Sequence, residues 1–286
     1  MPATFRTCSS RARFPKSRSA ESLRVLNRPS APGSNGELTV CCASFSYVIR
    51  AHPVLVIGAT RGTGKEVVSR LLRDGYIVRA LARDPSTAAA LLGSNVEIVR
   101  GDVTKPETLA PALLDAAHVI FTAGVTKRPA AEHSIIAVEY EGVKNTLAAA
   151  KETGFAGRFL YMTAMGVTRR SVESIVLNLI KGNTLKWRRH AEDEIRRSGL
   201  DYTIVRCGVL TNRDSNRAVD LSQRAHRMSL ARRISRNAAA EVFVQALRHS
   251  ASSRTTFDAA WTTHASPEPW DALFARLRPD SCVRRD

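Results

Sequence analysis

A glycine-rich turn between an apolar run and an amphipathic segment constrains the fold of this chain more than any other feature. Residues 54–57 read VLVI, which is typical of a strand buried on both faces. The turn at 58–64 reads GATRGTG, and an amphipathic stretch follows at 65–73. Glycine lets the backbone turn tightly, approach a pyrophosphate without an intervening Cβ, and bring the helix close to the strand. A structural turn can also contain two glycines, but the flanking strand and helix are the setting that a dinucleotide site needs.

Strand and helix patterns alternate along the rest of the chain. The apolar and periodic segments predict further strands at 76–82, 96–99, 119–122, 158–163, 202–206 and 255–260. They predict helices at 65–73, 86–92, 107–114, 135–153, 185–197, 238–248 and 269–278. This alternation indicates βαβ units and a doubly wound parallel sheet, the Rossmann fold. We expect one α/β domain at 51–286, with elements on the substrate side from about residue 207, and a disordered N-terminal extension.

The chain is strongly basic, with 43 Lys and Arg against 26 Asp and Glu in 286 residues, a net charge of +17. Its 44 % hydrophobic content excludes a collagen-like or wholly disordered chain. No apolar run approaches the roughly 20 residues of a membrane-spanning helix. The charge leaves nucleic acid, an anionic membrane surface, anionic ligands or a targeting segment as explanations.

The first 50 residues contribute much of this charge. They hold eight Lys and Arg, nine Ser and only two acidic residues, Glu21 and Glu37, and they show no apolar periodicity. Such composition is typical of an organelle transit peptide, and VCCA at 40–43 resembles a plastid processing site. We therefore expect an organelle location, plastid ahead of mitochondrion. A plain disordered tail on a cytoplasmic protein, or a stretch upstream of the true start codon, are the alternatives.

Cysteine and histidine usage argues against a metal or disulfide framework. Three of the five cysteines lie in the first 50 residues, and only Cys207 and Cys282 lie in the body. There is no CxxC pair and no His-x-x-x-His pair, so the sequence predicts no metal site. The pattern suits a reducing compartment.

Two arginines favour NADP(H) over NAD(H). NAD-binding proteins place an acidic residue about 20 residues beyond the glycine loop, where it binds the ribose 2′-hydroxyl. Here Arg83 ends the second predicted strand and Arg61 lies in the loop itself, a pair suited to a 2′-phosphate. Asp84 could oppose this, or could serve as a turn or helix-cap residue before Pro85. Solvated arginines at a strand end are the alternative explanation.

A set of further motifs carries a family resemblance over roughly residues 53–261. They are GDV at 101–103, TAG at 122–124, VEYEGVKN at 138–145, MGVT at 165–168, AE at 191–192, SGLDYTIVR at 198–206, ISR at 234–236 and AEV at 240–242. Together with the loop and Arg83, they resemble the atypical short-chain dehydrogenases/reductases, specifically the NAD(P)H-binding, NmrA-like group that includes plastid members.

The resemblance implies where a dinucleotide lies. It implies Asp102 beside the adenine, Ala123 and Gly124 along the nicotinamide ribose, and a substrate pocket over the carboxyl ends of the strands. The predicted cofactor-binding residues are Gly58, Thr60, Arg61, Gly62, Thr63, Gly64, Arg83, Asp102, Val103, Ala123 and Gly124.

The usual catalytic apparatus of short-chain dehydrogenases is not found in position. Tyr140 and Lys144 match Tyr-x-x-x-Lys, but they precede the fifth strand, whereas the catalytic pair must follow it, so we interpret them as helix packing. Thr163 stands where relatives carry a serine, and Arg188 replaces a lysine. Arginine binds phosphate or ribose oxygens but keeps its proton, so it is a poor proton shuttle. Thr163 and Arg188 are the two candidate catalytic residues.

Two function classes remain open at this point. One is an NADP(H)-dependent oxidoreductase acting on a small carbonyl or quinone substrate. The other is a non-catalytic NADP(H)-binding redox sensor, or a scaffold subunit of an organellar complex. A basic stretch at 224–236 lacks interleaved aromatics, so nucleic acid is disfavoured, and we interpret it as a solvated helical face or a surface for an acidic protein partner.

Overall fold

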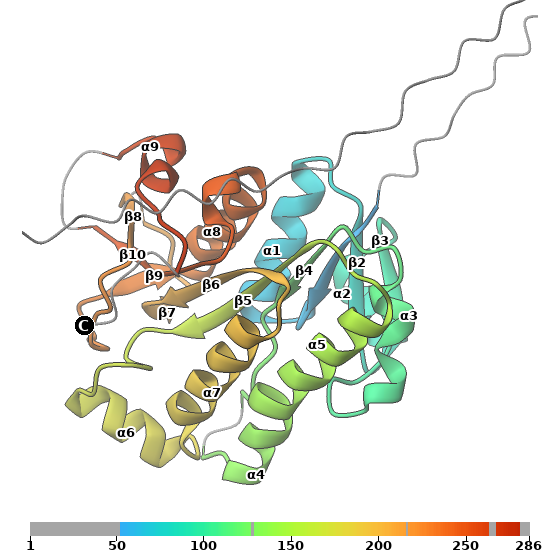
Figure 1. Ribbon diagram of the computed structural model, residues 1–286, viewed down its shortest axis with the longest axis horizontal. Helices are drawn as coiled ribbons and strands as arrows, with labels where there is room; N and C mark the ends of the chain where they lie inside the picture. Colours follow the sequence, from blue (N-terminus) through green and yellow to red (C-terminus); the bar gives the residue numbers. More distant parts are fainter. Residues whose placement is uncertain (1–51, 127–128, 216, 263–266, 281–286) are drawn as a thin grey trace, which may run out of the picture. The chain divides into compact units, whose positions relative to one another are not determined.

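The computed structural model describes residues 52–126, 129–215, 217–262 and 267–280. The predicted transit peptide at 1–50 lies outside the described residues. The elements in chain order (Figure 1) are β1 (Val54–Ile57), α1 (Gly62–Arg73), β2 (Val78–Ala82), α2 (Pro85–Leu92), β3 (Val96–Arg100), η1 (Pro106–Thr108), α3 (Ala110–Leu113), β4 (His118–Phe121), α4 (Glu132–Ile135), η2 (Ile136–Glu141), α5 (Gly142–Glu152), β5 (Arg158–Ala164), α6 (Val172–Ile180), α7 (Thr184–Arg197), β6 (Asp201–Cys207), β7 (Val209–Thr211), β8 (Val219–Ser222), β9 (Arg233–Ser235), α8 (Arg236–Arg248), η3 (Ser250–Ser252), β10 (Thr255–Trp261) and α9 (Trp270–Ala275).

The main sheet confirms the predicted α/β Rossmann architecture. Its strand order is β3-β2-β1-β4-β5-β6-β10-β8. Seven of these strands run parallel, and only the edge strand β8 pairs antiparallel, with β10. The order reverses between β1 and β4, so the crevice at this switch point is where such sheets bind ligands.

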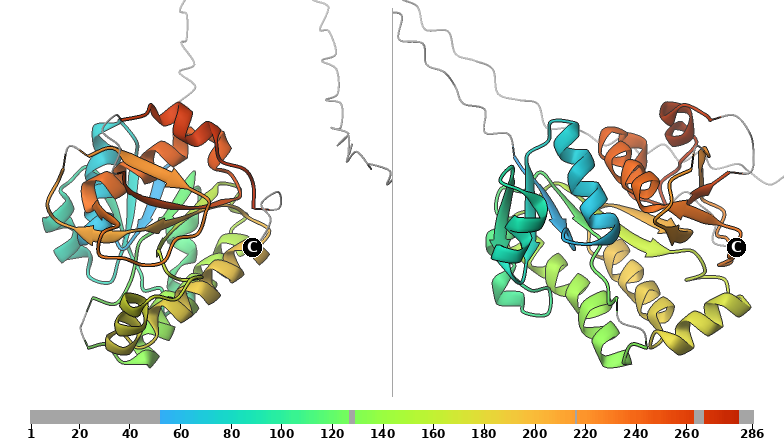
Figure 2. Two further views of the ribbon diagram at one scale, coloured as in Figure 1. Left: turned by 90° about the vertical axis from the view of Figure 1, so that its left-hand side faces the viewer. Right: turned by 180° about the vertical axis from the view of Figure 1, so that it is seen from behind.

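Helices cover both faces of the sheet (Figure 2). α1 and α8 pack on one face, where Val67, Leu71 and Phe243 are fully buried. α3, α5 and α7 pack on the other, where Leu147 and Ile195 lie in the core. Strand residues alternate between these two cores, which explains why the strands are nearly continuous apolar runs.

Several elements differ from the prediction. The expected helix at 135–153 is interrupted by η2, a π-helical segment, before it continues as α5. The expected helix at 107–114 is reduced to η1 and the four-residue α3, because Pro106 and Pro111 cannot donate helical hydrogen bonds. α6 and the three short strands β7, β8 and β9 were not predicted at all.

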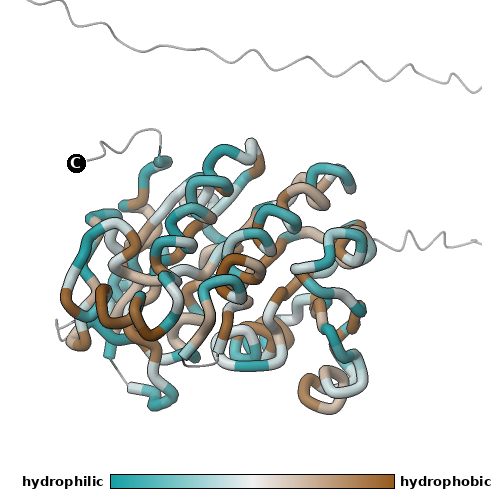
Figure 3. Tube along the Cα trace, turned by 90° about the horizontal axis from the view of Figure 1, so that it is seen from below, coloured by the Kyte–Doolittle hydropathy of each residue, from teal (hydrophilic) through white to brown (hydrophobic). Residues whose placement is uncertain are grey.

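Helix α6 presents an unusual apolar surface. Its trace is mostly hydrophobic, as the coloured tube in Figure 3 shows, yet five of its side chains are exposed. They are Val172, Ile175, Val176, Leu179 and Ile180. Sequence periodicity failed here because it identifies a helix by the burial of one face, and this helix buries only Ser174. No helix among the described residues is both long and apolar enough to cross a bilayer.

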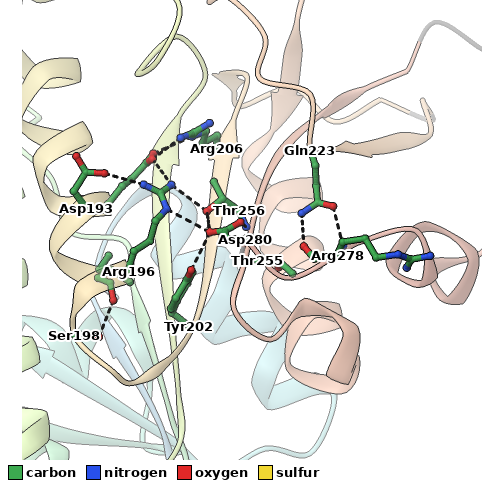
Figure 4. A network of polar contacts seen from close by, with 12 residues as sticks. Asp193, Arg196, Ser198, Tyr202, Arg206, Gln223, Thr255, Thr256, Arg278 and Asp280 are labelled. Atoms are coloured by element: carbon green, nitrogen blue, oxygen red, sulfur yellow. Dashed lines mark hydrogen bonds and ion pairs between the residues drawn. The ribbon is translucent and has the colours of Figure 1, made fainter. Parts of the chain in front are cut away.

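The chain beyond α9 is fixed to the sheet by the carboxylate of Asp280 (Figure 4). Its Oδ2 accepts from the hydroxyls of Tyr202 and Thr256 at 2.9 and 2.7 Å and from Arg196 Nε at 3.3 Å. The buried carboxylate of Glu192 accepts hydrogen bonds from both Arg196 and Arg206. These bonds join α7, β6 and β10 into one unit.

Candidate functional site

The glycine loop packs too closely against neighbouring backbone for a Cβ at Gly58 or Gly64. Gly58 has a φ of +89°, and a Cβ there would lie 2.7 Å from the backbone N of Ala123, beyond β4. A Cβ at Gly64 would lie 2.1 Å from the carbonyl O of Gly58. The first contact closes the loop onto the segment after β4, and the second lets α1 approach β1. The positive φ of Gly58 forms the tight turn, and the approach of α1 to β1 needs Gly64, so both agree with reasons for which the sequence predicted glycine here.

The N-terminus of α1 is open toward this loop. The N-cap residue Arg61 makes no side-chain cap, and the first turn contains no acidic residue. Thr63 is 3 % exposed, yet its Oγ1 has no hydrogen-bond partner among the described residues. Unpaired N–H groups and the positive end of the helix dipole favour a phosphate at this position. The buried hydroxyl supplies one more donor, so the residues present fit a pyrophosphate.

Arg61 and Arg83 lie at the same edge of the sheet. β1 and β2 pair with Ile57 opposite Leu81, so the loop and Arg83 follow neighbouring strand ends. Both arginines are exposed, and neither side chain has a hydrogen bond or ion pair within the part of the chain that the structure describes. Both guanidiniums are therefore available to an anion.

Asp84, next to Arg83, serves as a helix cap. Its carboxylate accepts from the backbone N and the hydroxyl of both Ser86 and Thr87 at the start of α2. The hydrogen bond from the Thr87 hydroxyl, followed by that from Ser86, lowers the pKa of Asp84 to about 2. Of the two roles considered for Asp84, the structure shows the cap.

The other predicted cofactor residues follow β3 and β4. Asp102 Oδ1 accepts from the backbone N and the hydroxyl of Thr104, at 2.9 Å each, which fixes the turn after β3. Val103 is buried against Gly142 at the start of α5. Thr60 lies in the glycine loop, half-buried. The structure thus brings the predicted residues to one edge of the sheet, at the ends of β1 to β4.

Gly124 lies against a buried ion pair that the sequence did not reveal. A Cβ at Gly124 would lie 2.9 Å from Arg188 Nη2 and 3.0 Å from Glu139 Oε1. Arg188 Nε donates to Glu139 Oε2 at 2.8 Å, and its Nη1 donates to the carbonyl O of Met162 at 3.2 Å. Arg188 therefore connects η2, the segment after β4, and the end of β5.

Glu139 is the centre of this network. Its side chain is 1 % exposed, and it also accepts from Thr184 Oγ1 at 2.5 Å and from the backbone N of Val125 at 3.0 Å. Burial is the largest single influence and would raise the pKa of Glu139. The Arg188 charge and the hydrogen bonds from Arg188, Thr184 and Val125 outweigh it and lower the pKa below its usual value. The same carboxylate raises the pKa of Arg188, against the effect of burial. Both groups are thus charged, and Arg188 holds its proton.

Thr163, the other candidate, is the second-last residue of β5, next to Met162. It is 2 % exposed and its Oγ1 has no partner among the described residues. Tyr140 and Lys144 lie elsewhere: the Tyr140 ring packs on Trp187 at 5.4 Å between centroids, and Lys144 Nζ is 3.1 Å from Glu141. This contact agrees with the helix-packing interpretation of Tyr140.

Sequence reasoning missed Arg236 as a neighbour of the glycine loop. The sequence had placed Arg236 in the ISR motif at 234–236 and in the basic stretch at 224–236, and the structure shows that Arg236 begins α8. A Cβ on Gly62 would lie 3.4 Å from Arg236 Nε. The Nη1 of Arg236 donates to Asn212 Oδ1. Only the packing of α8 beside α1 brings this arginine to the loop, and no local motif encodes that packing.

Comparison with known proteins agrees with this geometry. Residues 58–250 match the family described as NAD(P)H-binding. TIC 62, a chloroplast protein of Arabidopsis thaliana, is 30 % identical over 196 residues, which cover 62 % of this chain and 30 % of that protein. An uncharacterised chloroplastic protein of the same plant is 30 % identical over 241 residues, covering 80 % of this chain and 84 % of that protein. The chain spans about a third of the length of the TIC 62 proteins that it matches.

The fold also resembles solved structures. A short-chain dehydrogenase/reductase from Veillonella parvula in complex with NADP superposes with a TM-score of 0.61 at 16 % identity, covering 76 % of this chain and 98 % of that one. The family match spans well over half of the chain, and it includes the glycine cradle and the open end of α1. The chain therefore belongs to the NAD(P)H-binding family of atypical short-chain dehydrogenases/reductases, and it is related to the plastid TIC 62 proteins.

Proposed function

We propose that the chain is an NADP(H)-dependent oxidoreductase that reduces a carbonyl or quinone group of a small substrate. One observation carries this proposal: two buried hydroxyls without partners, those of Thr63 and Thr163, lie at the carboxyl edge of the same sheet. A buried polar group without a partner costs free energy, so its persistence points to a ligand that completes it. Thr63 suits the pyrophosphate, and Thr163 suits the oxygen of a substrate.

The cofactor would be held along the edge of the sheet. The backbone N–H groups at the start of α1 and the Thr63 hydroxyl would bind the pyrophosphate, with Gly58, Thr60, Gly62 and Gly64 shaping the cradle. Arg61 and Arg83 would bind the 2′-phosphate. Asp102 and Val103 would lie beside the adenine, and Ala123 and Gly124 beside the nicotinamide ribose.

The chemistry requires little of the protein besides positioning. NADPH, when bound, supplies the hydride from its nicotinamide ring. The Thr163 hydroxyl would donate a hydrogen bond to the substrate oxygen and so stabilise the negative charge that develops there. Arg188 would keep Gly124 and the end of β5 in place through Glu139 and Met162. The proton that completes the reduction would come from water, since Arg188 keeps its own.

Replacing Thr163 with Val tests the catalytic part of the proposal. Valine keeps the shape and removes the hydroxyl, so we expect kcat with a carbonyl or quinone substrate to fall by roughly tenfold to a hundredfold while the Kd for NADPH stays unchanged. The measurement is NADPH oxidation followed by absorbance across a panel of quinones, aldehydes and ketones. Thr146, buried with its hydroxyl bonded to Gly142, provides the control variant Thr146→Val. Equal turnover in Thr163→Val and wild type would contradict the assignment.

Replacing Arg83 with Ala tests the choice of cofactor. If this side chain binds the 2′-phosphate, its loss raises the Kd for NADPH by roughly tenfold to a hundredfold. The Kd for NADH stays within about twofold of the wild-type value. Fluorescence titration of both nucleotides measures the two Kd values. Arg73→Ala, at the far end of α1, removes the same charge away from the loop and should change neither. An equal loss for both nucleotides would refute the 2′-phosphate role.

A second candidate is a non-catalytic NADP(H)-binding sensor or scaffold. One observation favours it: Arg188, which replaces the family's lysine, is fully engaged by Glu139 and Met162 and does not release a proton. Tight NADPH binding with no turnover across the substrate panel would select this alternative.

We also propose a plastid location. The relatives TIC 62 and the uncharacterised Arabidopsis protein are named as chloroplastic, and the first 50 residues are rich in Arg and Ser and poor in acids.

A further inference from the structure

The basic stretch after β8 lines a pocket instead of forming a helical face. Residues 223–232 adopt no regular helix, so the helical interpretation from the sequence is wrong. A pocket of about 500 Å³ lies here, lined by Arg169, Arg224, His226, Arg227, Ser229 and Arg232. Its volume is within the range of sites for small molecules.

The pocket is cationic, and three of its four arginines have no counterion among the described residues. None of the lining residues is acidic. The side chain of Arg169 makes one contact, with the carbonyl O of Ala225 at 3.5 Å. The side chains of Arg224, Arg227 and Arg232 have no hydrogen bond or ion pair with any residue in the described ranges. Like charges placed together without counterions raise the free energy of the folded chain, and a bound anion removes this penalty.

The loop that carries these arginines is held in place by buried contacts. The carboxylate of Asp258 on β10 is 2 % exposed, and it accepts from the backbone N of His226 at 2.8 Å and lies 3.0 Å from His226 Nδ1. The carbonyl O of Met228 accepts from Ser171 Oγ at 2.8 Å. The backbone of the loop is therefore fixed before a ligand arrives, which reduces the part of the entropic cost of binding that comes from ordering the loop.

The loop that carries the arginines of the pocket also packs just beyond the carboxyl end of β5, the strand that contains Thr163. Met228 packs against Gly166, where a Cβ would lie 2.8 Å from the Met228 Cβ. Gly166 is three residues beyond Thr163, which is at most about 10 Å of chain. The loop therefore covers the carboxyl end of β5, next to the candidate reaction site.

We propose that this pocket binds an organic polyanion, a molecule with two or more carboxylate or phosphate groups, and that this is the anionic end of the substrate. The role as a substrate site depends on the proposed oxidoreductase function, whereas anion binding does not. Guanidinium groups bind carboxylate and phosphate through paired hydrogen bonds, and several of them around one pocket select multiple charges.

Calorimetric titration of the full chain with citrate and with inorganic pyrophosphate tests the proposal. Saturating NADPH is present, so that the glycine loop is not available to the probes. We expect Arg224→Gln/Arg227→Gln to weaken anion binding at least tenfold and to leave the Kd for NADPH unchanged. Both side chains are exposed, so the variant should fold normally. The control Arg73→Gln/Arg197→Gln removes two charges on α1 and α7, neither of which lines the pocket, and should change anion binding by less than about twofold.

Each outcome has a clear meaning. Binding of both probes, or of one, that depends on Arg224 and Arg227 supports the pocket, and the preferred probe identifies carboxylate or phosphate chemistry. If neither probe binds, or if both double variants lose the same anion affinity, the proposed anion pocket is wrong. If NADPH fails to bind but citrate binds through these arginines, the pocket stands and the proposed function falls.

Discussion

Replacing Glu139 with Gln lowers the free energy of unfolding by about 3–5 kcal/mol, because Arg188 is left as a buried charge without a counterion. Glutamine keeps the size and one acceptor, so the loss arises from the charge and not from a cavity. The side chains of Glu139 and Arg188 are 1 % and 13 % exposed, so water does not replace the lost carboxylate. Chemical denaturation followed by circular dichroism measures the change.

Glu141→Gln is the matched control for this variant. Glu141 lies two residues further along the same element and pairs with Lys144, but both side chains are over 40 % exposed. A surface pair contributes at most about 1 kcal/mol, so this control should stay close to wild type. Equal stability of the two variants would contradict the role given to the buried pair.

The stability difference also depends on pH. The folded state lowers the pKa of Glu139 from its ordinary value of 4.5. A carboxyl with a lowered pKa contributes stability that is fully present above the unfolded value and is lost as the pH falls through the folded value. The difference between wild type and Glu139→Gln should therefore be constant near neutral pH and shrink on acidification below about pH 4.5.

The sequence predicted the sheet well for a physical reason. Parallel strands covered on both faces must be apolar throughout, so runs such as VLVI at 54–57 are visible without any knowledge of their neighbours. The glycine loop was visible because its requirement is local, a backbone without Cβ atoms between a strand and a helix. Short edge elements such as β8 (VDLS) carry no such requirement, and they were missed.

The electrostatic part of the site could not be predicted in the same way. Glu139 and Arg188 are 49 residues apart, and their pairing depends on the π-helical turn η2, which places Glu139 inward. The Arg236 side chain reaches Gly62 only through the packing of α8 against α1. Local periodicity contains no information on either contact. Asp84 is the contrasting case, because a helix cap depends only on the next three residues, and the sequence had offered that role.

Replacing Arg61 with Asp should weaken NADPH binding at least about a hundredfold and at the same time stabilise the protein. Arg61 occupies the N-cap of α1 in extended conformation, with φ −149° and ψ 158°, but it provides no cap. Aspartate at this position accepts hydrogen bonds from the helix N–H groups and adds about 0.5–2 kcal/mol. The same carboxylate occupies the site of the pyrophosphate. Two negative unit charges about 5 Å apart, one on the aspartate and one on the pyrophosphate, repel each other by roughly 3 kcal/mol at an effective dielectric constant of 20. The Kd for NADPH should therefore rise at least about a hundredfold.

Arg61→Asn separates the two effects. Asparagine is an equally good cap without the negative charge, so this variant should gain similar stability and lose NADPH affinity by only about tenfold. Thermal unfolding and fluorescence titration of the three proteins measure both quantities. The opposite signs of the two effects are what make the pair informative, because general damage to the fold would lower stability and affinity together. If Arg61→Asp binds NADPH as tightly as wild type, the phosphates do not lie at the end of α1, and the proposed mode of cofactor binding is wrong.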